Sequence, residues 1–164
     1  MSVYTTCYHS PIGKIKISGT GDYISEVIFT DEDMSTSQLS EQLPPLLIDC
    51  TEQLIQYFQG VRRFFELPLN QQGTSFQQEV WTELMSIAYA KTVSYINIAR
   101  RTGDPKATRA VANANAKNHL CIIVPCHRVI GVNNELTGYS GGIWRKKWLL
   151  EHEKKIAYGI QTLF

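Results

Sequence analysis

Residues 94–118, "SYINIARRTGDPKATRAVANANAKN", place a break between two short helical segments, and this break constrains the fold more than any other feature. Gly103 predicts the end of the first helix. Asp104 is a good N-cap for the second helix, and Pro105 suits its first position because proline lacks the N–H left unpaired there. Two short helices joined by a tight turn are typical of a helix-turn-helix, although many helical hairpins that bind no DNA share the pattern.

The second of these helices has two dissimilar faces. A spacing of i, i+3, i+4, i+7 predicts a core-facing stripe, which consists of Ala107, Ala110, Val111 and Ala114. The opposite face then carries Arg109, Ala112, Asn113 and Ala116. One long cation among small residues lets the helix backbone approach a surface closely, with Arg109 as the only projection. This face is either an ordinary solvated surface or one pressed into a DNA groove with one arginine as a probe.

The chain before this region predicts a small mixed domain. Alternating apolar residues and turn residues predict an antiparallel hairpin of residues 14–18 and 23–29, preceded by a turn at residues 10–13. Residues 46–60 read as a helix that ends at Gly60, a typical C-terminal cap residue. The remaining assignments are a further strand at residues 62–67 and a linker at residues 68–74.

A further helix is predicted from Ser75 onward. Ser75 and Gln78 fit a capping box, in which two side chains satisfy unpaired N–H groups at the start of a helix. An apolar stripe follows, made by Phe76, Val80, Leu84 and Ile87. The chain is therefore expected to form two domains, residues 1–72 and residues 73–164.

The two predicted domains differ in charge. Residues 1–72 contain four Lys/Arg and nine Asp/Glu, a net of −5, whereas residues 73–164 contain twelve and six, a net of +6. Mixed charge often reflects nothing more than a solvated surface. The functional alternative is that the second domain faces a polyanion while the first does not.

Composition limits the compartment in which the chain is expected to work. With 164 residues, the chain can hold one sizeable core or two small domains. No apolar run approaches the roughly 20 residues of a membrane span, and the N-terminus lacks a signal peptide's apolar stretch. The four cysteines are few and scattered, which suits a reducing compartment better than a disulfide framework. We expect a cytoplasmic protein with no membrane partner.

The segment "LCIIVPCHRV" sets Cys126 beside His127 after a run that reads as a buried strand. A structural core cysteine is the commonest state for this residue type. Metal binding would need Cys121, Cys126 and a histidine to converge, but five residues of extended chain span about 16 Å at ~3.3 Å each. Zinc ligands lie about 2.3 Å from the metal, so the metal interpretation is disfavoured.

Nucleophilic catalysis is the third interpretation of Cys126. A free thiol near pKa 8.5 is only a few per cent thiolate at neutral pH, so a base must assist it. Adjacent strand residues point to opposite sides, so His127 would act through a bridging water or an unusual turn that Pro125 imposes. Glu153 is a candidate to orient His127, because it shares a helix face with two leucines and a buried carboxylate is costly unless it is paired.

The chain resembles the O6-alkylguanine-DNA alkyltransferases, also called methylated-DNA–protein-cysteine methyltransferases. The signature is "IIVPCHRVIG", followed by "LTGYSGG" and "KKWLLEHE". Upstream, "YFQGVRRFFELPL", "GTSFQQEVW", "TVSYINIA" and "PKATRAV" fit in order and spacing. The match covers most of residues 55–155, with weaker similarity over "SPIGKIKI".

The resemblance implies a role for each residue of the alkyl-acceptor site. Cys126 would attack the alkyl carbon of the damaged guanine, His127 would act through water as its base, and Glu153 would orient the imidazole. Asn118 would hold together the turn beneath the site. The residues that would contact the flipped base are Tyr95, Val129, Tyr139 and Ser140, with Tyr139 donating a hydrogen bond or proton to the departing purine.

The resemblance also implies how DNA is bound. Arg109 would replace the flipped base in the stack, and Tyr95 would crowd the adjacent phosphate so that the nucleotide rotates out. The other implied DNA contacts are Ala107, Thr108 and Asn113. The partner would be double-stranded DNA containing O6-alkylguanine, entered through the minor groove. We expect a monomer, with cooperative binding along DNA left open.

The family also implies the fold class and the reaction. The chain would be an α/β protein with a small ribonuclease-H-like domain followed by a mostly helical, winged-helix-like domain. Its activity would be DNA repair by irreversible, stoichiometric transfer of the alkyl group to Cys126, with O4-alkylthymine allowed as a second substrate. No cofactor is implied. Some relatives carry an N-terminal zinc site, for which this chain lacks a ligand set, so no metal is expected.

Two departures from the family pattern stand near the site. The family often has "IP-aromatic-Gly" before its helix-turn-helix, whereas this chain reads "IAYA" with Ala88 and Ala90. Asn118 is usually followed by proline but here by His119. Neither change touches the nucleophile.

Three other functions compete with alkyl transfer. The first is a non-enzymatic binder of damaged DNA, whose relatives replace the nucleophile, often with tryptophan. The second is a transcription regulator, which in this family usually carries an extra DNA-binding domain. The third is a Cys-His hydrolase, for which no oxyanion-hole motif is recognisable. The intact Cys126 favours the alkyltransferase.

Overall fold

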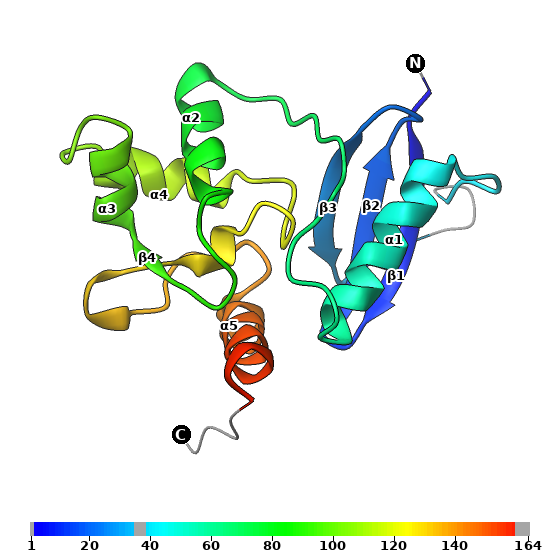
Figure 1. The fold of residues 1–164 in the computed structure, drawn as a ribbon. Coiled ribbons are helices and arrows are strands. Elements are labelled where there is room, and N and C mark those ends of the chain that lie inside the picture. The colour runs from blue at the N-terminus through cyan, green and yellow to red at the C-terminus, as the bar shows by residue number, and fades with distance from the viewer. Residues whose placement is uncertain (1, 35–38, 160–164) are drawn as a thin grey trace. The chain divides into compact units, whose positions relative to one another are not determined.

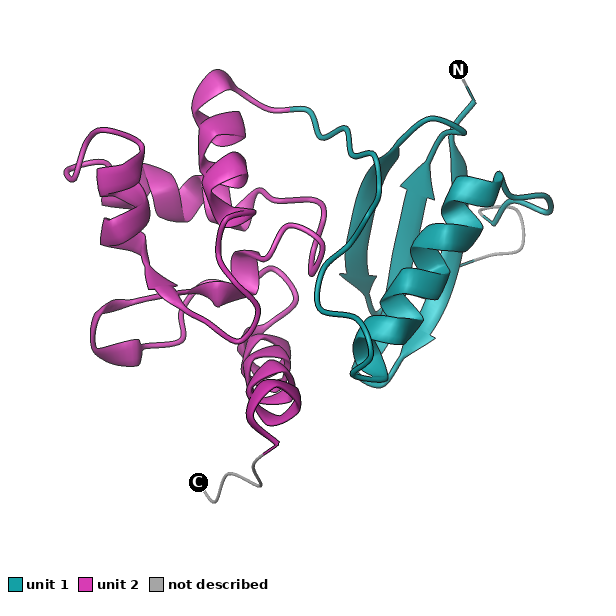
Figure 2. Ribbon diagram, viewed as in Figure 1, with its two compact units in different colours: residues 1–72 teal, residues 73–164 magenta. Residues whose placement is uncertain are grey.

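A computed structural model of the chain describes residues 2–34 and 39–159, which form two compact units, residues 1–72 and 73–164 (Figure 2). The first unit contains a three-stranded antiparallel sheet in the order β1 (Tyr4–Ser10), β2 (Gly13–Gly19) and β3 (Ile24–Thr30). Helix α1 (Pro45–Phe58) lies across one face of this sheet (Figure 1). The predicted hairpin is confirmed as β2 and β3, whereas β1 was not predicted because its side chains lack a clear alternation.

The core of the first unit lies between α1 and the sheet. Ile15 and Ile17 on β2 and Leu47 and Leu54 on α1 are all buried, and the strand and the helix pack against each other. The helix ends as predicted, because Gly60 adopts a φ of 81° and the chain turns there. Burying this apolar face is what joins a sheet of three short strands to a single helix.

The predicted strand at residues 62–67 is wrong. This segment has no strand in the structure, and Arg62 instead hydrogen-bonds the Gln56 side chain of α1. Extended pairing occurs just beyond it, where Leu69 forms an isolated parallel bridge with Ile24. Propensity alone placed the strand too early, because only the contact with the edge of β3 decides which residues pair.

The second unit is mostly helical. Its helices are α2 (Ser75–Leu84), α3 (Tyr95–Arg101), α4 (Thr108–Ala116) and α5 (Ile143–Tyr158). A two-stranded parallel sheet joins β4 (Val93–Ser94) to β5 (Val129–Ile130). Short 3-10 helices cover Cys126–Arg128 and Val132–Asn134. Helices α2, α3 and α4 pack on one another, and α3 and α4 form the predicted helix-turn-helix (Figure 1).

Two predicted helix starts are shifted. The capping box of α2 is formed by Thr74 and Gln77, one residue before the predicted pair, and both reciprocal hydrogen bonds are present. Helix α4 begins at Thr108 rather than at Pro105. Asp104 does not cap the helix, because its carboxylate accepts from the Lys106 N–H within a separate turn.

The buried stripe of α4 is also shifted from the prediction. Val111 and Ala114 are buried as expected, but Ala110 is exposed and Ala107 is only partly covered. Asn115 is buried instead, and its side chain donates to the Cys126 carbonyl at 3.3 Å. The buried side of α4 is therefore formed by Val111, Ala114 and Asn115, while Arg109 is exposed.

Ala90 occupies a turn that favours glycine. The Lys91 N–H bonds the Ala88 carbonyl at 3.0 Å, and Ala90 has a φ of 63° in the third position of that turn. An L-residue in this left-handed region costs about 1–2 kcal/mol relative to glycine. Replacing Ala90 with glycine should therefore relieve the strain in this turn.

Ala90→Gly is expected to stabilise the second unit by about 0.5–1 kcal/mol after glycine's greater freedom in the unfolded chain is subtracted. The Tm should rise by about 2–4 °C, measured by the fluorescence of the tryptophans, all of which lie in residues 73–164. The control is Ala88→Gly in the same turn, where φ is not positive and no gain is expected. An equal change in both variants would contradict the strain at Ala90.

No helix in the described part of the chain is long and apolar enough to span a membrane.

Candidate alkyl-acceptor site

The segment that precedes Cys126 is a compact turn, so the predicted buried strand is wrong. The Ile123 N–H bonds the Cys121 carbonyl at 2.8 Å around Ile122, whose φ is 73°; this is the rarer and strained form of γ-turn. The Cys126 N–H bonds the Val124 carbonyl at 2.7 Å around Pro125 (φ −80°, ψ 63°), an inverse γ-turn. The chain therefore reverses its direction between Cys121 and Cys126. The two cysteines are not separated by the extended chain that the sequence had predicted.

Asn118 ties the two ends of this turn together. Its amide nitrogen donates to the Val124 carbonyl at 2.9 Å, and its amide oxygen accepts from the Leu120 N–H at 3.0 Å. Asn115 fixes the backbone of Cys126, because its side-chain amide donates to the Cys126 carbonyl. Asn115 was not singled out in the sequence, because its burial depends on the rotation of α4.

His127 and Glu153 form the pair that sequence reasoning proposed. The His127 Nε2 lies 2.6 Å from the Glu153 Oε2, and both side chains are fully buried. Arg128 joins them, donating from its Nε to Glu153 Oε1 at 2.8 Å and from its NH2 nitrogen to Oε2 at 3.1 Å. Its remaining nitrogen donates to the Ile87 carbonyl at 2.8 Å. Arg128 therefore belongs to this group of side chains, although its place in the motif was the only sign of this in the sequence.

The charges in this group decide the protonation of His127. Burial alone would raise the pKa of Glu153, but the charge and hydrogen bond of His127 and the hydrogen bonds of Arg128 outweigh it and hold this pKa well below its usual range. Burial lowers the pKa of His127 against the opposing effect of Glu153. An ionised Glu153 keeps the proton on Nε2, so Nδ1 is left with a free lone pair and no hydrogen-bond partner among the described residues. Nδ1 is therefore the basic atom of the site.

Cys126 is 2% exposed and lies against a second thiol, that of Cys121. The hydrogen bond between the two sulfur atoms and burial both raise the pKa of Cys126, while Asn118 and the charge of Lys146 act in the opposite direction. Cys126 is consequently a thiol at neutral pH until a base removes its proton.

Lys146 supplies a buried positive charge that the sequence did not reveal. Its Nζ donates to the Thr137 carbonyl at 2.8 Å and to the Tyr95 hydroxyl at 3.5 Å. Burial lowers its pKa to about 8, while nearby Cys126 raises it. The cue available in the sequence was a lysine on the same helical side as Leu149 and Glu153. A cation in this place favours a thiolate at Cys126.

The other predicted base-contacting residues lie close to these groups. Tyr95 begins α3, is 8% exposed and donates its hydroxyl to the Thr137 carbonyl at 3.1 Å. Tyr139 is buried beside Cys121, and the exposed Ser140 hydroxyl lies 3.8 Å from the Cys121 sulfur. Val129 is fully buried in β5, where it pairs with Val93.

The predicted DNA-contacting residues lie on the helix-turn-helix. Ala107 precedes α4 and Thr108 begins it, with its hydroxyl donating to the Pro105 carbonyl at 3.2 Å. Arg109 and Asn113 are exposed one turn apart on the same helix. All four residues lie at or just before the first turns of α4, where Arg109 and Asn113 are the exposed ones.

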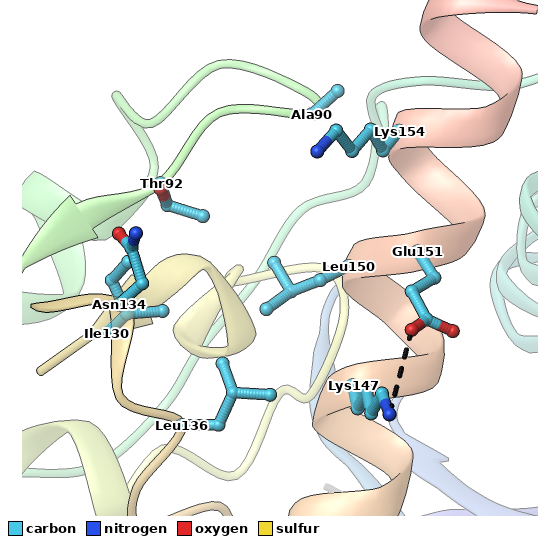
Figure 3. Close-up of a pocket in the computed structure, with 9 residues that line it drawn as sticks. All are labelled: Ala90, Thr92, Ile130, Asn134, Leu136, Lys147, Leu150, Glu151 and Lys154. Atoms are coloured by element: carbon cyan, nitrogen blue, oxygen red, sulfur yellow. Dashed lines mark ion pairs between the residues drawn. The ribbon is translucent and has the colours of Figure 1, made fainter. Parts of the chain in front are cut away.

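A cavity of about 580 Å³ lies elsewhere in the second unit, between α5, β5 and the loop that holds Ala90 (Figure 3). Its charged lining residues are Lys147, Glu151 and Lys154, and the first two form an ion pair of 3.9 Å. Its lining contains no cysteine or histidine. We therefore assign the chemistry to the Cys126 group, where a nucleophile and a base lie together.

A helix-turn-helix joined to a buried cysteine with a histidine–glutamate pair defines a class of DNA-binding proteins whose reactive group is a thiol. Two family models match the chain in this order. Residues 3–71 match the ribonuclease-like domain of 6-O-methylguanine DNA methyltransferase, and residues 75–155 match its DNA-binding domain. The chain belongs to the 6-O-methylguanine DNA methyltransferase family.

Individual relatives cover almost the whole chain. The constitutive methylated-DNA–protein-cysteine methyltransferase of Bacillus subtilis is 44% identical over 163 residues, which is 96% of this chain and 98% of the relative. A crystal structure of the Mycobacterium tuberculosis O6-methylguanine methyltransferase is 40% identical, covers 97% of each chain and has a TM-score of 0.85. The M. tuberculosis protein in complex with DNA is 42% identical, covers 94% of this chain and 93% of that one, and has a TM-score of 0.83. These similarities confirm the family and the α/β fold class expected from the sequence.

Proposed function

We propose that this protein repairs DNA by transferring the alkyl group of O6-alkylguanine to Cys126, once per molecule. The observation that carries the proposal is the buried Cys126 beside His127, whose Nε2 is held 2.6 Å from Glu153. Membership of the methyltransferase family supports the same reaction. O4-alkylthymine is a second substrate that the same chemistry allows.

The reaction needs one proton removed and one supplied. The His127 Nδ1 takes the Cys126 proton through a water, and Glu153 stabilises the imidazolium that forms. The thiolate attacks the alkyl carbon, so the S–C bond forms as the bond from carbon to guanine O6 breaks. The guanine leaves as an anion and takes a proton from a nearby donor, the role we assign to Tyr139, with Ser140 at the guanine oxygen.

The buried cation contributes to the first half of this reaction. Lys146 stabilises the thiolate and also holds the Thr137 carbonyl, two residues before Tyr139. Asn118 keeps the turn closed so that the Cys126 sulfur stays aimed at the incoming base. The product is a thioether, which ordinary cellular thiols do not reverse, so each molecule acts once.

The experiment that tests this proposal uses the full chain and a duplex with one O6-methylguanine. Peptide mass analysis should find one methyl group, on Cys126, with transfer ending at one equivalent of DNA. Repeated turnover, or a methyl group on another residue, would overturn the single-use mechanism.

The substrate must leave the DNA stack to reach a buried thiol. Flipping a nucleotide costs a few kcal/mol, which the protein must offset with contacts in the duplex. We assign this task to α4, which would enter the minor groove through its small residues Ala107, Thr108 and Asn113, with Arg109 filling the space of the flipped base. Tyr95 would crowd the neighbouring phosphate. The net charge of +6 over residues 73–164 supports binding to a polyanion.

Arg109→Ala is expected to slow repair of duplex DNA by about 10- to 100-fold, because the unstacked state loses its substitute for the flipped base. Transfer from a free alkylated guanine base should change less than about twofold, since no stack is opened. Single-turnover rates on both substrates measure the difference. Arg63→Ala is the control, because it removes the same charge from an exposed position in the first unit. Equal losses on the two substrates would remove Arg109 from the flipping role.

We further propose that the protein acts in the cytoplasm as a monomer on DNA. All four cysteines are free thiols, which suits a reducing compartment. The intact Cys126 also argues against the alternative of a binder that only signals damage.

A further inference from the structure

The acceptor site contains a thiol that alkyl transfer does not use. Cys121 is 1% exposed and Cys126 is 2% exposed, and the two buried thiols are close enough for each to shift the pKa of the other. Both are free thiols in this structure. In the transfer mechanism Cys121 donates and accepts nothing at the substrate, so its position against the nucleophile is unexplained by that reaction.

The backbone between the two cysteines forms a closed loop. The two γ-turns at Ile122 and Pro125 reverse the chain between Cys121 and Cys126. A third hydrogen bond, from the Val124 N–H to the Leu120 carbonyl at 2.9 Å, closes the same loop. A β-branched residue with a φ of 73° is strained, so the surrounding contacts must enforce this arrangement.

The surroundings of Cys121 favour its thiolate. The neighbouring Cys126 thiol and the Ser140 hydroxyl lower the pKa of Cys121, against the effect of burial. The Ser140 hydroxyl lies 3.8 Å from the Cys121 sulfur, and Ser140 is itself exposed. Cys50 differs from Cys121 in this respect, since burial raises the pKa of Cys50 to about 12 and leaves its thiol unreactive. The site thus holds two neighbouring thiols, of which Cys121 is the more acidic.

We propose that Cys121 is the resolving thiol of Cys126: a hydroperoxide oxidises the pair to an intramolecular disulfide that blocks the acceptor reversibly. One thiolate attacks a peroxide oxygen and becomes a sulfenic acid, releasing water once a proton is taken up. The second thiolate attacks that sulfur, the S–O bond breaks and a second water leaves. Two thiols and one hydrogen peroxide give one disulfide and two waters, with both electrons passing to the peroxide.

The resolving thiol changes the fate of the acceptor. A cysteine with no partner proceeds from sulfenic to sulfinic acid, which ordinary thiols do not reduce. A disulfide closed across a strained six-residue turn is instead readily reduced by thiol exchange. Cys121 therefore protects a residue that the cell can use only once. The disulfide itself does not depend on the alkyl-transfer function, whereas its effect on repair rests on that proposed function.

The test treats the full chain with hydrogen peroxide and maps its peptides by mass. The wild type should lose two hydrogens in a peptide that links Cys121 to Cys126. Its transfer to methylated duplex DNA should fall by more than about tenfold and return after dithiothreitol. Under the same treatment, Cys126 of Cys121→Ala and of Cys121→Ser should gain oxygen atoms. Dithiothreitol should not return either variant to the activity that it had before peroxide was added. Cys7→Ala is the control, since it removes the partly buried thiol of β1 and should behave as the wild type.

The outcomes separate this inference from the proposed function. A wild type that transfers methyl groups but forms no linked peptide, or forms it only between molecules, overturns the inference alone. A linked peptide in a protein that never transfers a methyl group overturns the proposed function and leaves the disulfide standing. Full recovery of peroxide-treated Cys121→Ala by dithiothreitol would show that Cys121 has no protective role.

Discussion

Replacing Cys126 with serine is expected to lower alkyl transfer by about 10⁴–10⁶-fold, the scale seen when a catalytic nucleophile is removed. A serine hydroxyl fits the same space and can keep the same hydrogen bonds. However, its proton is far harder for a neutral imidazole to remove than that of a thiol, so His127 cannot generate the nucleophile. The loss therefore tests chemistry rather than packing.

The measurement is the single-turnover rate of transfer from a duplex with one O6-methylguanine, with DNA binding measured in parallel. Cys126→Ser should bind the duplex within a few-fold of the wild type because the surface of α4 is unchanged. Cys7→Ser, which alters a thiol in the first unit, should keep the wild-type rate. Methyl transfer by Cys126→Ser at more than a trace would place the acceptor elsewhere in the chain.

Glu153→Gln is expected to destabilise the second unit by about 3–5 kcal/mol, because it removes one partner of a buried ion pair. Glu153 is fully buried and accepts hydrogen bonds from His127 and Arg128, and a weaker one from the Ala90 N–H at 3.2 Å. The neutral amide leaves the Arg128 guanidinium, only 6% exposed, without a compensating charge. Urea unfolding followed by tryptophan fluorescence reports on this unit.

The matched control for this loss is Glu151→Gln on the same helix. Glu151 is exposed and lies 3.9 Å from the exposed Lys147, so its removal should cost less than about 1 kcal/mol. A cost for Glu153→Gln no greater than that of Glu151→Gln would contradict the coupled buried pair. In the double variant with Arg128→Met, the combined loss should be smaller than the sum of the single losses, since the stranded charge is gone.

Transfer should also fall in Glu153→Gln, by about 10²–10⁴-fold, which is the usual contribution of a general base. Glutamine can present its N–H₂ group to His127, in which case the proton moves from Nε2 to Nδ1 and the basic atom is lost. Rates must be measured at a temperature where the variant is folded. An unchanged rate in the folded variant would limit Glu153 to a structural role.

Much of this protein could be predicted because local signals agree with the final fold. The hairpin of β2 and β3, helix α1 with Gly60 at its end, and the paired helices of residues 95–116 follow from periodicity and turn residues close in sequence. The exposed Arg109 follows from the same reasoning. One error, at residues 62–67, lies where a distant strand decides which residues pair, and the other, at the start of α4, lies where a local turn at Asp104 competes with the helix.

Residue identity alone determined that Cys126, His127 and Glu153 belong to one acceptor site, because the motif and the cost of a buried carboxylate both point there. Only the tertiary structure decided how they work. Glu153 lies 26 positions from His127, and Arg128 and Lys146 become buried charges through packing that no local pattern encodes. The turn before Cys126 is the clearest case: Ile-Ile-Val favours a strand, but Asn118 and the surrounding core hold it in γ-turns. Long-range contacts outweigh local propensity there, and they bring Cys121 against the nucleophile.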